Sequence, residues 1–158
     1  MFARYYVELS IDAGEVERAL VRSPEAWLPG IAGKASTRGE RLLAEVGFGD
    51  EVRFEKEVEI QFGTPLRTPT KTILPIHWSA AGTPGLFPEL DADLEVAPLG
   101  AHQTQLSMSA RYVPPLGAVG RVIDRAVLHR VAEATLKDFL DHVSEALLVQ
   151  AAHSNRPA

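Results

Sequence analysis

The chain has 158 residues, a length typical of one domain that buries roughly two-thirds of its unfolded surface. Its 46% hydrophobic and 23% charged content argues against a disordered or a membrane-spanning chain. The net charge is -5 and the 16 basic residues are scattered, so we expect no nucleic-acid partner. The absence of cysteine excludes disulfides, thiolate metal sites and cysteine nucleophiles. No apolar run is long enough for a signal peptide or a membrane span, which favours a cytoplasmic protein.

The first eleven residues alternate between apolar and polar side chains, and this period of two predicts a half-buried strand over residues 2–11. Asp12 and Glu15 have the spacing of a helix N-cap, which predicts a short helix over residues 14–21. Pro24 favours the start of a second short helix, because proline is well tolerated at the first helical position. Pro29 and Gly30 are expected to end that second helix.

Between about residues 38 and 114, turn signals separate five expected strands, and no stretch is long enough for a crossover helix. Strand pairing should therefore be mostly antiparallel. The clearest strand covers residues 51–62, after an expected hairpin turn at residues 47–50. In the next one, Pro69 and Pro75 share one parity, which predicts an edge strand or a bulged one. Two further one-sided strands follow, at residues 90–96 and 104–112.

A helical period begins after the Pro114–Pro115 pair and predicts one long helix over residues 118–149. Its second half carries an apolar stripe that includes Leu136, Phe139 and Val143. Projected back along the helix, that stripe meets charged residues, while the upstream apolar residues, such as Val127, lie nearly opposite. We therefore expect a break or bend near residues 129–134, or else a second packing partner for the N-terminal half.

This order of elements, with residues 86–95 (LFPELDADLE) and 112–116 (YVPPL) as its most specific segments, resembles the START, pollen-allergen and polyketide-cyclase superfamily, called SRPBCC. The resemblance implies an α+β helix-grip fold. In that fold a curved antiparallel sheet of six or seven strands wraps a long C-terminal helix, with two short helices after the first strand. The absence of a linker and the polar end of the chain predict one domain over residues 1–150 with a polar tail at 151–158. The resemblance implies a cavity between sheet and helix for an apolar or aromatic small molecule.

The residues expected to line that cavity lie on the apolar parity of the strands, on the short helices, or on the stripe of the last helix. They are Tyr5, Trp27, Phe54, Lys56, Val58, Thr72, Trp78, Leu94, Met108, Tyr112, Phe139 and Val143. Thr68 and Thr70 would add hydroxyl groups beside Thr72. For most of these residues, ordinary core packing is the alternative interpretation.

Lys56 is the one charged residue on the apolar parity of its strand. A buried ammonium group is costly unless it is paired, so Lys56 is a candidate anchor for a ligand carboxylate or phenolate. The alternative is that its stem packs at the rim while its ammonium group reaches water.

No motif indicates a metal, a cofactor or a common catalytic centre. The run Asp91, Asp93 and Glu95 lacks the glycine and terminal glutamate of a calcium loop and fits a solvated strand face. The five histidines form no HxH or HExxH pair, and no GxSxG, Walker or GxGxxG motif occurs.

Three hypotheses remain. The first is a binding domain for a hydrophobic molecule such as a lipid, polyketide or aromatic metabolite. The second is a cyclase or dehydratase in which Lys56 anchors the substrate and Tyr112 donates a proton. The third is an interaction module, in which Val119, Ile123 and Val127 on the last helix dock a second copy, giving a homodimer, or another protein.

Overall fold

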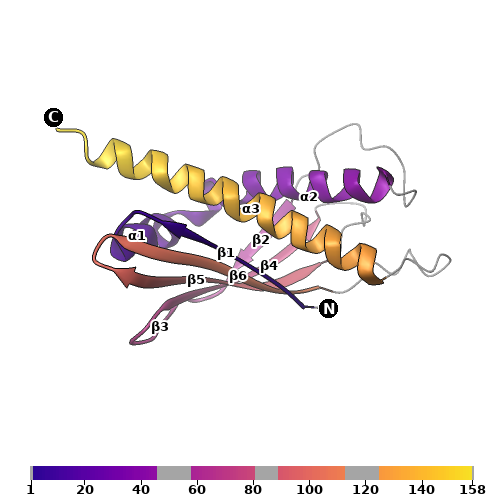
Figure 1. Cartoon of the computed structure of the whole chain (residues 1–158), viewed down its shortest axis with the longest axis horizontal. Helices are drawn as coiled ribbons and strands as arrows, with labels where there is room; N and C mark the ends of the chain where they lie inside the picture. Colours follow the sequence, from indigo (N-terminus) through magenta and orange to yellow (C-terminus); the bar gives the residue numbers. More distant parts are fainter. Residues whose placement is uncertain (1, 46–57, 81–88, 113–124, 158) are drawn as a thin grey trace.

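The computed structural model describes residues 2–45, 58–80, 89–112 and 125–157. Figure 1 shows a curved sheet with two long helices above it. In chain order the described elements are β1 (Phe2–Leu9), α1 (Ala13–Arg22), the 3-10 turn η1 (Pro24–Ala26), α2 (Leu28–Glu45), β2 (Val58–Phe62), β3 (Leu66–Arg67), β4 (Thr72–Ala80), β5 (Leu90–Gly100), β6 (Gln103–Tyr112) and α3 (Arg125–Ser154).

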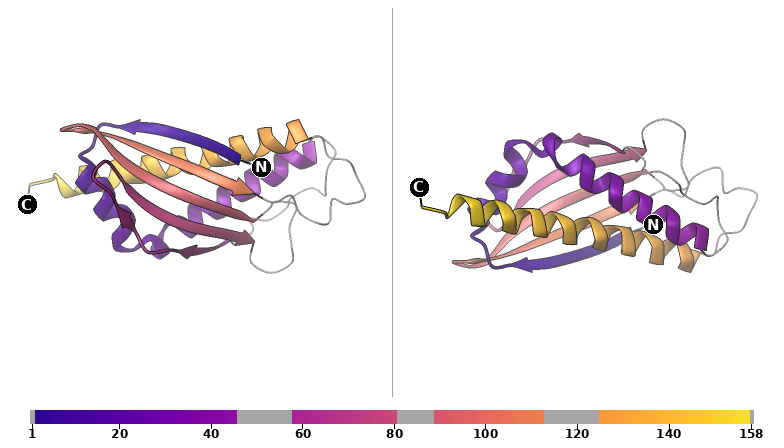
Figure 2. Two further views of the ribbon diagram at one scale, coloured as in Figure 1. Left: turned by 90° about the horizontal axis from the view of Figure 1, so that it is seen from below. Right: turned by 90° about the horizontal axis from the view of Figure 1, so that it is seen from above.

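The six described strands form one antiparallel sheet in the order β1-β6-β5-β4-β2, with β3 also paired to β4. Both views of Figure 2 show α2 and α3 side by side over the same face of this sheet. The arrangement confirms the predicted α+β helix-grip fold. The opposite, outer face carries the charged parity of β5, including Asp91 and Asp93, as a solvated strand face requires.

Helix α1 forms where the capping residues predict it. The Asp12 side chain accepts a hydrogen bond of 2.8 Å from the backbone N–H of Gly14, and this satisfies one of the donors left free at a helix start. Val16 and Leu20 then bury one face of the helix. The prediction for this helix is confirmed.

The predicted end of the second helix at Pro29 and Gly30 is wrong, because α2 begins at Leu28 and continues to Glu45. Proline in a first helical turn loses no hydrogen bond, since the N–H groups there have no partner within the helix. The strand region expected from about residue 38 therefore starts later. The buried face of α2 carries small residues, including Ala32, Ala35 and Ser36, which allow close packing against α3.

The predicted break in the last helix is also wrong, because α3 runs without interruption from Arg125 to Ser154. Leu128, Val131 and Ala132 are buried and continue the stripe of Leu136 and Phe139 at the i, i+3, i+4 spacing of one helix face. The N-terminal half does have the second partner that was the alternative, since α2 packs along α3. The helix also extends into the expected polar tail, to residue 154.

Strand β4 lies between β5 and the β2/β3 pair, so the prediction of an edge strand is wrong. The irregularity that Pro75 predicted is present, because residues 63–65 face only residues 74 and 75 of β4. The Pro75 carbonyl accepts a hydrogen bond of 2.8 Å from the Gly63 N–H within this stretch. Gly63 is needed there, since a Cβ atom would lie 2.9 Å from the Pro75 Cβ. Proline is thus accommodated inside the sheet.

Candidate functional site

The inner face of the sheet is built from rows of side chains that lie opposite one another on neighbouring strands. Trp78 of β4 faces Leu90 of β5, which faces Tyr112 of β6, and Ile60 of β2 lies beside Trp78. This row crosses the end of the sheet where β4 and β6 end and where β5 begins. We call Trp78, Leu90 and Tyr112 the aromatic row.

The next inward row begins with Ile76 of β4 and continues with three small residues. Ala92, Ala110 and Ala3 lie opposite one another on β5, β6 and β1. Because alanine side chains are short, they leave room above the sheet for large side chains from α3. Phe139 of α3 contacts Trp78, with ring centroids 5.3 Å apart and ring planes inclined at 56°. The tilted geometry is one that aromatic pairs favour.

The predicted lining residues do not converge on one point. Met108 and Leu94 lie opposite each other one row beyond the alanines, with Tyr5 next to Met108 on β1. Thr72 lies six residues from Trp78 along β4, which at ~3.3 Å per residue is roughly 20 Å away. The described members of the set on the strands are therefore spread over the inner face of the sheet, and among them Trp78 is in ring contact with Phe139.

The described side chains of this interior are closed off from solvent. Met108, Phe139 and Val143 have 0% exposure, and Trp78 and Leu94 have 1%. A side chain next to a sealed or open void large enough for water would retain accessible surface. These residues therefore pack against protein, at the close density usual for cores.

Tyr112 is the one ionisable side chain of the aromatic row. Burial raises its pKa above the usual 10.0, and the Glu133 carboxylate raises it further. Both effects disfavour the phenolate, so the hydroxyl stays protonated at neutral pH. Chemically it is a hydrogen-bond donor rather than a nucleophile or a base.

Thr72 and the two neighbouring threonines have other roles than those predicted. The Thr72 hydroxyl donates to the Glu17 carboxylate at 3.1 Å, and Glu17 also pairs with Arg67 at 2.6 Å. Thr68 and Thr70 are exposed in the turn before β4 and do not extend the inner wall, which corrects that expectation. Of the three predicted threonines, only Thr72 remains a candidate for the inner wall, and its hydroxyl is already hydrogen-bonded to Glu17.

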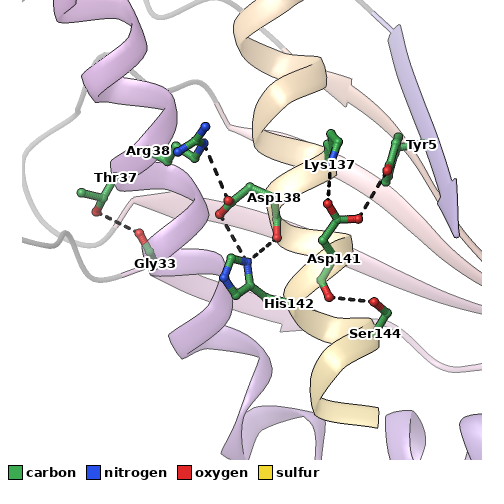
Figure 3. A network of polar contacts seen from close by, with 9 residues as sticks. All are labelled: Tyr5, Gly33, Thr37, Arg38, Lys137, Asp138, Asp141, His142 and Ser144. Carbon is green, nitrogen blue, oxygen red and sulfur yellow. Dashed lines mark hydrogen bonds and ion pairs between the residues drawn. The ribbon is translucent and has the colours of Figure 1, made fainter. Parts of the chain in front are cut away.

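Tyr5 lies at the side of the interior, where β1 meets α3. Its hydroxyl donates to Asp141 at 3.3 Å, and Asp141 accepts from Lys137 at 2.5 Å, as Figure 3 shows. The Lys137 ammonium also lies 5.7 Å from the centre of the Tyr5 ring. Asp141 holds the pKa of Lys137 above its usual value, first through their hydrogen bond and then through its charge. Tyr5 thus ties α3 to the first strand.

A second polar cluster joins the two long helices. Asp138 of α3 lies 3.7 Å from the Arg38 guanidinium of α2 and 3.6 Å from the His142 ring (Figure 3). These groups are partly exposed, so the pair contributes about 0–1 kcal/mol to stability. It links α2 to α3 at mid-length of α3.

The remaining predicted residues fall in three places. Val58 is buried at the start of β2, beyond the aromatic row. Trp27 is half buried between η1 and α2 and packs against the core. Phe54 and Lys56 lie outside the described residues, as does the expected turn at residues 47–50.

Two of the surface depressions among the described residues are formed by several elements together, and neither was predicted from the sequence. One, of about 670 Å³, lies between α1 and the last turns of α3 and includes Val16, Arg22 and Ala151. The other, of about 500 Å³, lies on the outer face of the sheet beside Phe2 and His77. Each is lined from elements far apart in the chain, so no local sequence signal marks either one.

Within the four described segments, histidine and carboxylate side chains form no group of three or more that could hold a metal ion. Among the helices of those segments, none has the length and apolar content needed to cross a membrane.

No protein-family model matches the chain, and no curated protein matches its sequence. Solved structures do match its fold over nearly its whole length. A conserved protein from Geobacillus kaustophilus has a TM-score of 0.54 at 14% identity, covering 94% of this chain and 95% of that one. The Zhui aromatase/cyclase from Streptomyces sp. R1128 has a TM-score of 0.51 at 14% identity, with 99% of each chain covered.

The structure titled Ara h 8.0201 gives a TM-score of 0.51 at 8% identity, covering 94% of this chain and 98% of that one. At these identities the likeness concerns the fold alone. The prediction is confirmed at that level: the chain has the predicted helix-grip fold.

Proposed function

We propose that the protein binds a flat, apolar small molecule between the sheet and α3, against the aromatic row and Phe139. The observation that carries this proposal is the pair of buried rings of Trp78 and Phe139, with Tyr112 in the same row as Trp78 on the far side of Leu90. A flat ring stacks well on such side chains, and the Tyr112 hydroxyl supplies a hydrogen-bond donor. One protein with this fold is named an aromatase/cyclase, which is in keeping with an aromatic ligand.

Binding at this place requires the interior to rearrange, because Trp78 and Phe139 now occupy the space. The ligand must replace their mutual contacts with its own. Any ligand that binds only the folded state stabilises it by about 2.7 kcal/mol at a hundredfold excess over its Kd. For a domain of this size that corresponds to a rise in melting temperature of roughly 5–10 °C.

The test uses the two tryptophans as separate reporters. Trp27→Phe leaves Trp78 as the single fluorophore in the interior, and Trp78→Phe leaves Trp27 outside it. Native mass spectrometry of freshly purified protein identifies any molecule that copurifies. If none does, anilinonaphthalene sulfonate serves as an apolar aromatic probe.

We expect the bound molecule or probe to quench or shift the emission of Trp78 and to leave that of Trp27 nearly unchanged. The melting temperature should rise with ligand concentration in both variants. A response from Trp27 alone, or saturating binding with no change at Trp78, would refute the interior site.

The two other hypotheses stay predictions. The proposed proton donor of a cyclase or dehydratase, Tyr112, is buried and protonated, but its expected partner Lys56 lies outside the described residues. For an interaction through α3, Val127 already packs against the protein's own core, while Val119 and Ile123 lie outside the described residues.

A further inference from the structure

Strand β1 lies at one edge of the described sheet. Among the described strands it pairs with β6 alone, and it is the last strand on that side of the sheet. Its backbone N–H and C=O groups on the outer side have no strand partner there, and such an edge is a template for pairing with another chain. Many proteins protect an edge with a proline, a bulge or an inward-pointing charge. Strand β1 has none of these, and its register with β6 is regular over residues 2–9.

The side chains on the outer face of β1 are open to solvent. Phe2 and Tyr6 are each 57% exposed, which is high for aromatic residues, and Arg4 and Glu8 are also exposed. Arg4 and Glu8 lie two positions before and two positions after Tyr6. Because successive side chains of a strand alternate between faces, all four lie on the same face.

We propose that β1 pairs with β1 of a second copy of this chain, in antiparallel orientation, about a two-fold axis at Tyr6. A two-fold contact must be self-complementary, so each residue meets its mirror position. An axis at Tyr6 places Arg4 opposite the partner's Glu8, and Glu8 opposite the partner's Arg4. Tyr6 then stacks on the partner's Tyr6, and the two sheets become one continuous sheet.

Other two-fold registers fit less well. An axis at Arg4 or at Glu8 would place like charges directly opposite one another, which is destabilising. An axis at Tyr5 or Val7 would place both charges opposite uncharged residues. The axis at Tyr6 is the register of these five that forms two opposite-charge pairs, and these pairs specify the alignment.

The monomer makes little use of these two charges. On β6, Arg4 lies opposite Ser109 and Glu8 lies opposite Gln105, both uncharged. Neither charge is in an ion pair with another described residue. Reversing either charge should therefore change the interface while the fold of the single copy is kept.

One strand pair is a small interface, below the roughly 1,200 Å² of total buried area at which stable complexes begin. The dimer should accordingly be reversible and dependent on concentration. Sedimentation velocity over a micromolar concentration series measures this equilibrium directly.

The test uses charge reversal at both positions. Arg4→Glu should raise the dimer dissociation constant about tenfold or more, because two like-charge pairs replace two opposite-charge pairs. Glu8→Arg should do the same. The double variant Arg4→Glu/Glu8→Arg restores both pairs in exchanged form and should dimerise like the unchanged protein.

Mixing gives a second test that does not depend on the double variant. The Arg4→Glu chain carries two acidic residues at these positions and the Glu8→Arg chain carries two basic ones, so an equal mixture should form a heterodimer. Circular dichroism and melting curves establish that each single variant is folded. A wild-type protein that stays monomeric, a dimer insensitive to both reversals, or a mixture without heterodimer would each overturn the proposal. None of these outcomes bears on ligand binding in the interior.

Discussion

Replacing Phe139 with alanine tests whether the interior is as tightly filled as the structure shows. The side chain is fully buried and its ring packs 5.3 Å from that of Trp78. A buried Phe→Ala change typically costs about 3–5 kcal/mol, from lost transfer free energy and from the cavity left behind. About 0.5–1.5 kcal/mol of this is expected from the ring pair itself.

The magnitude is large compared with the 5–15 kcal/mol of stability that is common for single domains. In a chain of 158 residues it lowers the melting temperature by roughly 10 °C. Urea unfolding followed by far-UV circular dichroism gives the free energy directly. Leu148→Ala on the same helix is the matched control, since Leu148 is 46% exposed and its loss should cost no more than about 0.5 kcal/mol.

A loss below about 1 kcal/mol for Phe139→Ala would refute the close packing of the interior. It would mean that the ring already borders empty space, and the expectation that a ligand must displace Trp78 would fail with it. A double-mutant cycle with Trp78→Leu and Phe139→Leu isolates the contact between the rings, because it subtracts what each side chain loses alone.

The remaining predictions concern single groups. Burial raises the pKa of Tyr112 in the folded state, so its stabilising contribution is complete below pH ~10 and is lost as pH rises through the raised value. Above pH ~10 the melting temperature of the wild type should therefore fall relative to that of Tyr112→Phe. Gly63→Ala should cost about 1–3 kcal/mol in urea unfolding, since its new Cβ would crowd Pro75. Gly30→Ala, in open space within α2, should instead stabilise by up to about 1 kcal/mol. Thr104→Val should cost about 1–3 kcal/mol, because the buried Thr104 hydroxyl donates at 2.6 Å to a backbone carbonyl.

The strands with strict alternation were predictable from the sequence. In β5 and β6 the apolar parity is buried, as expected of strands with one face on the core; Ser107 of β6 is the buried exception on the polar parity. The same rule placed Trp78 and Met108 on the inner face. Parity identifies the face, but it does not tell whether the space above that face is filled by protein or by a ligand.

Helix α2 was not predictable by the same means. Apart from Leu28, the described residues fully buried on α2 are small, such as Ala32 and Ala35, and small residues give no apolar stripe in the sequence. Pro29 and Gly30 then look like a helix C-terminus in the sequence, although proline in the first turn of a helix breaks no hydrogen bond. Pro75 illustrates the opposite case. The local signal was correct about an irregular ladder, but position in the sheet is decided by strands far away in the sequence.

The uninterrupted α3 explains where the fold leaves room for function. Leu128, Val131 and Ala132 continue its buried stripe, and α2 packs along its N-terminal half, so sheet and α2 together occupy the buried sides of the helix. In the described residues the inner face of the sheet is thus already committed to packing. A ligand can bind there only by displacing side chains such as Phe139. The loss of unfolding free energy in Phe139→Ala measures how much that side chain contributes to the packing. The β1 edge demands no such exchange, since β1 is an end strand of the described sheet and its Phe2 and Tyr6 rings are already exposed.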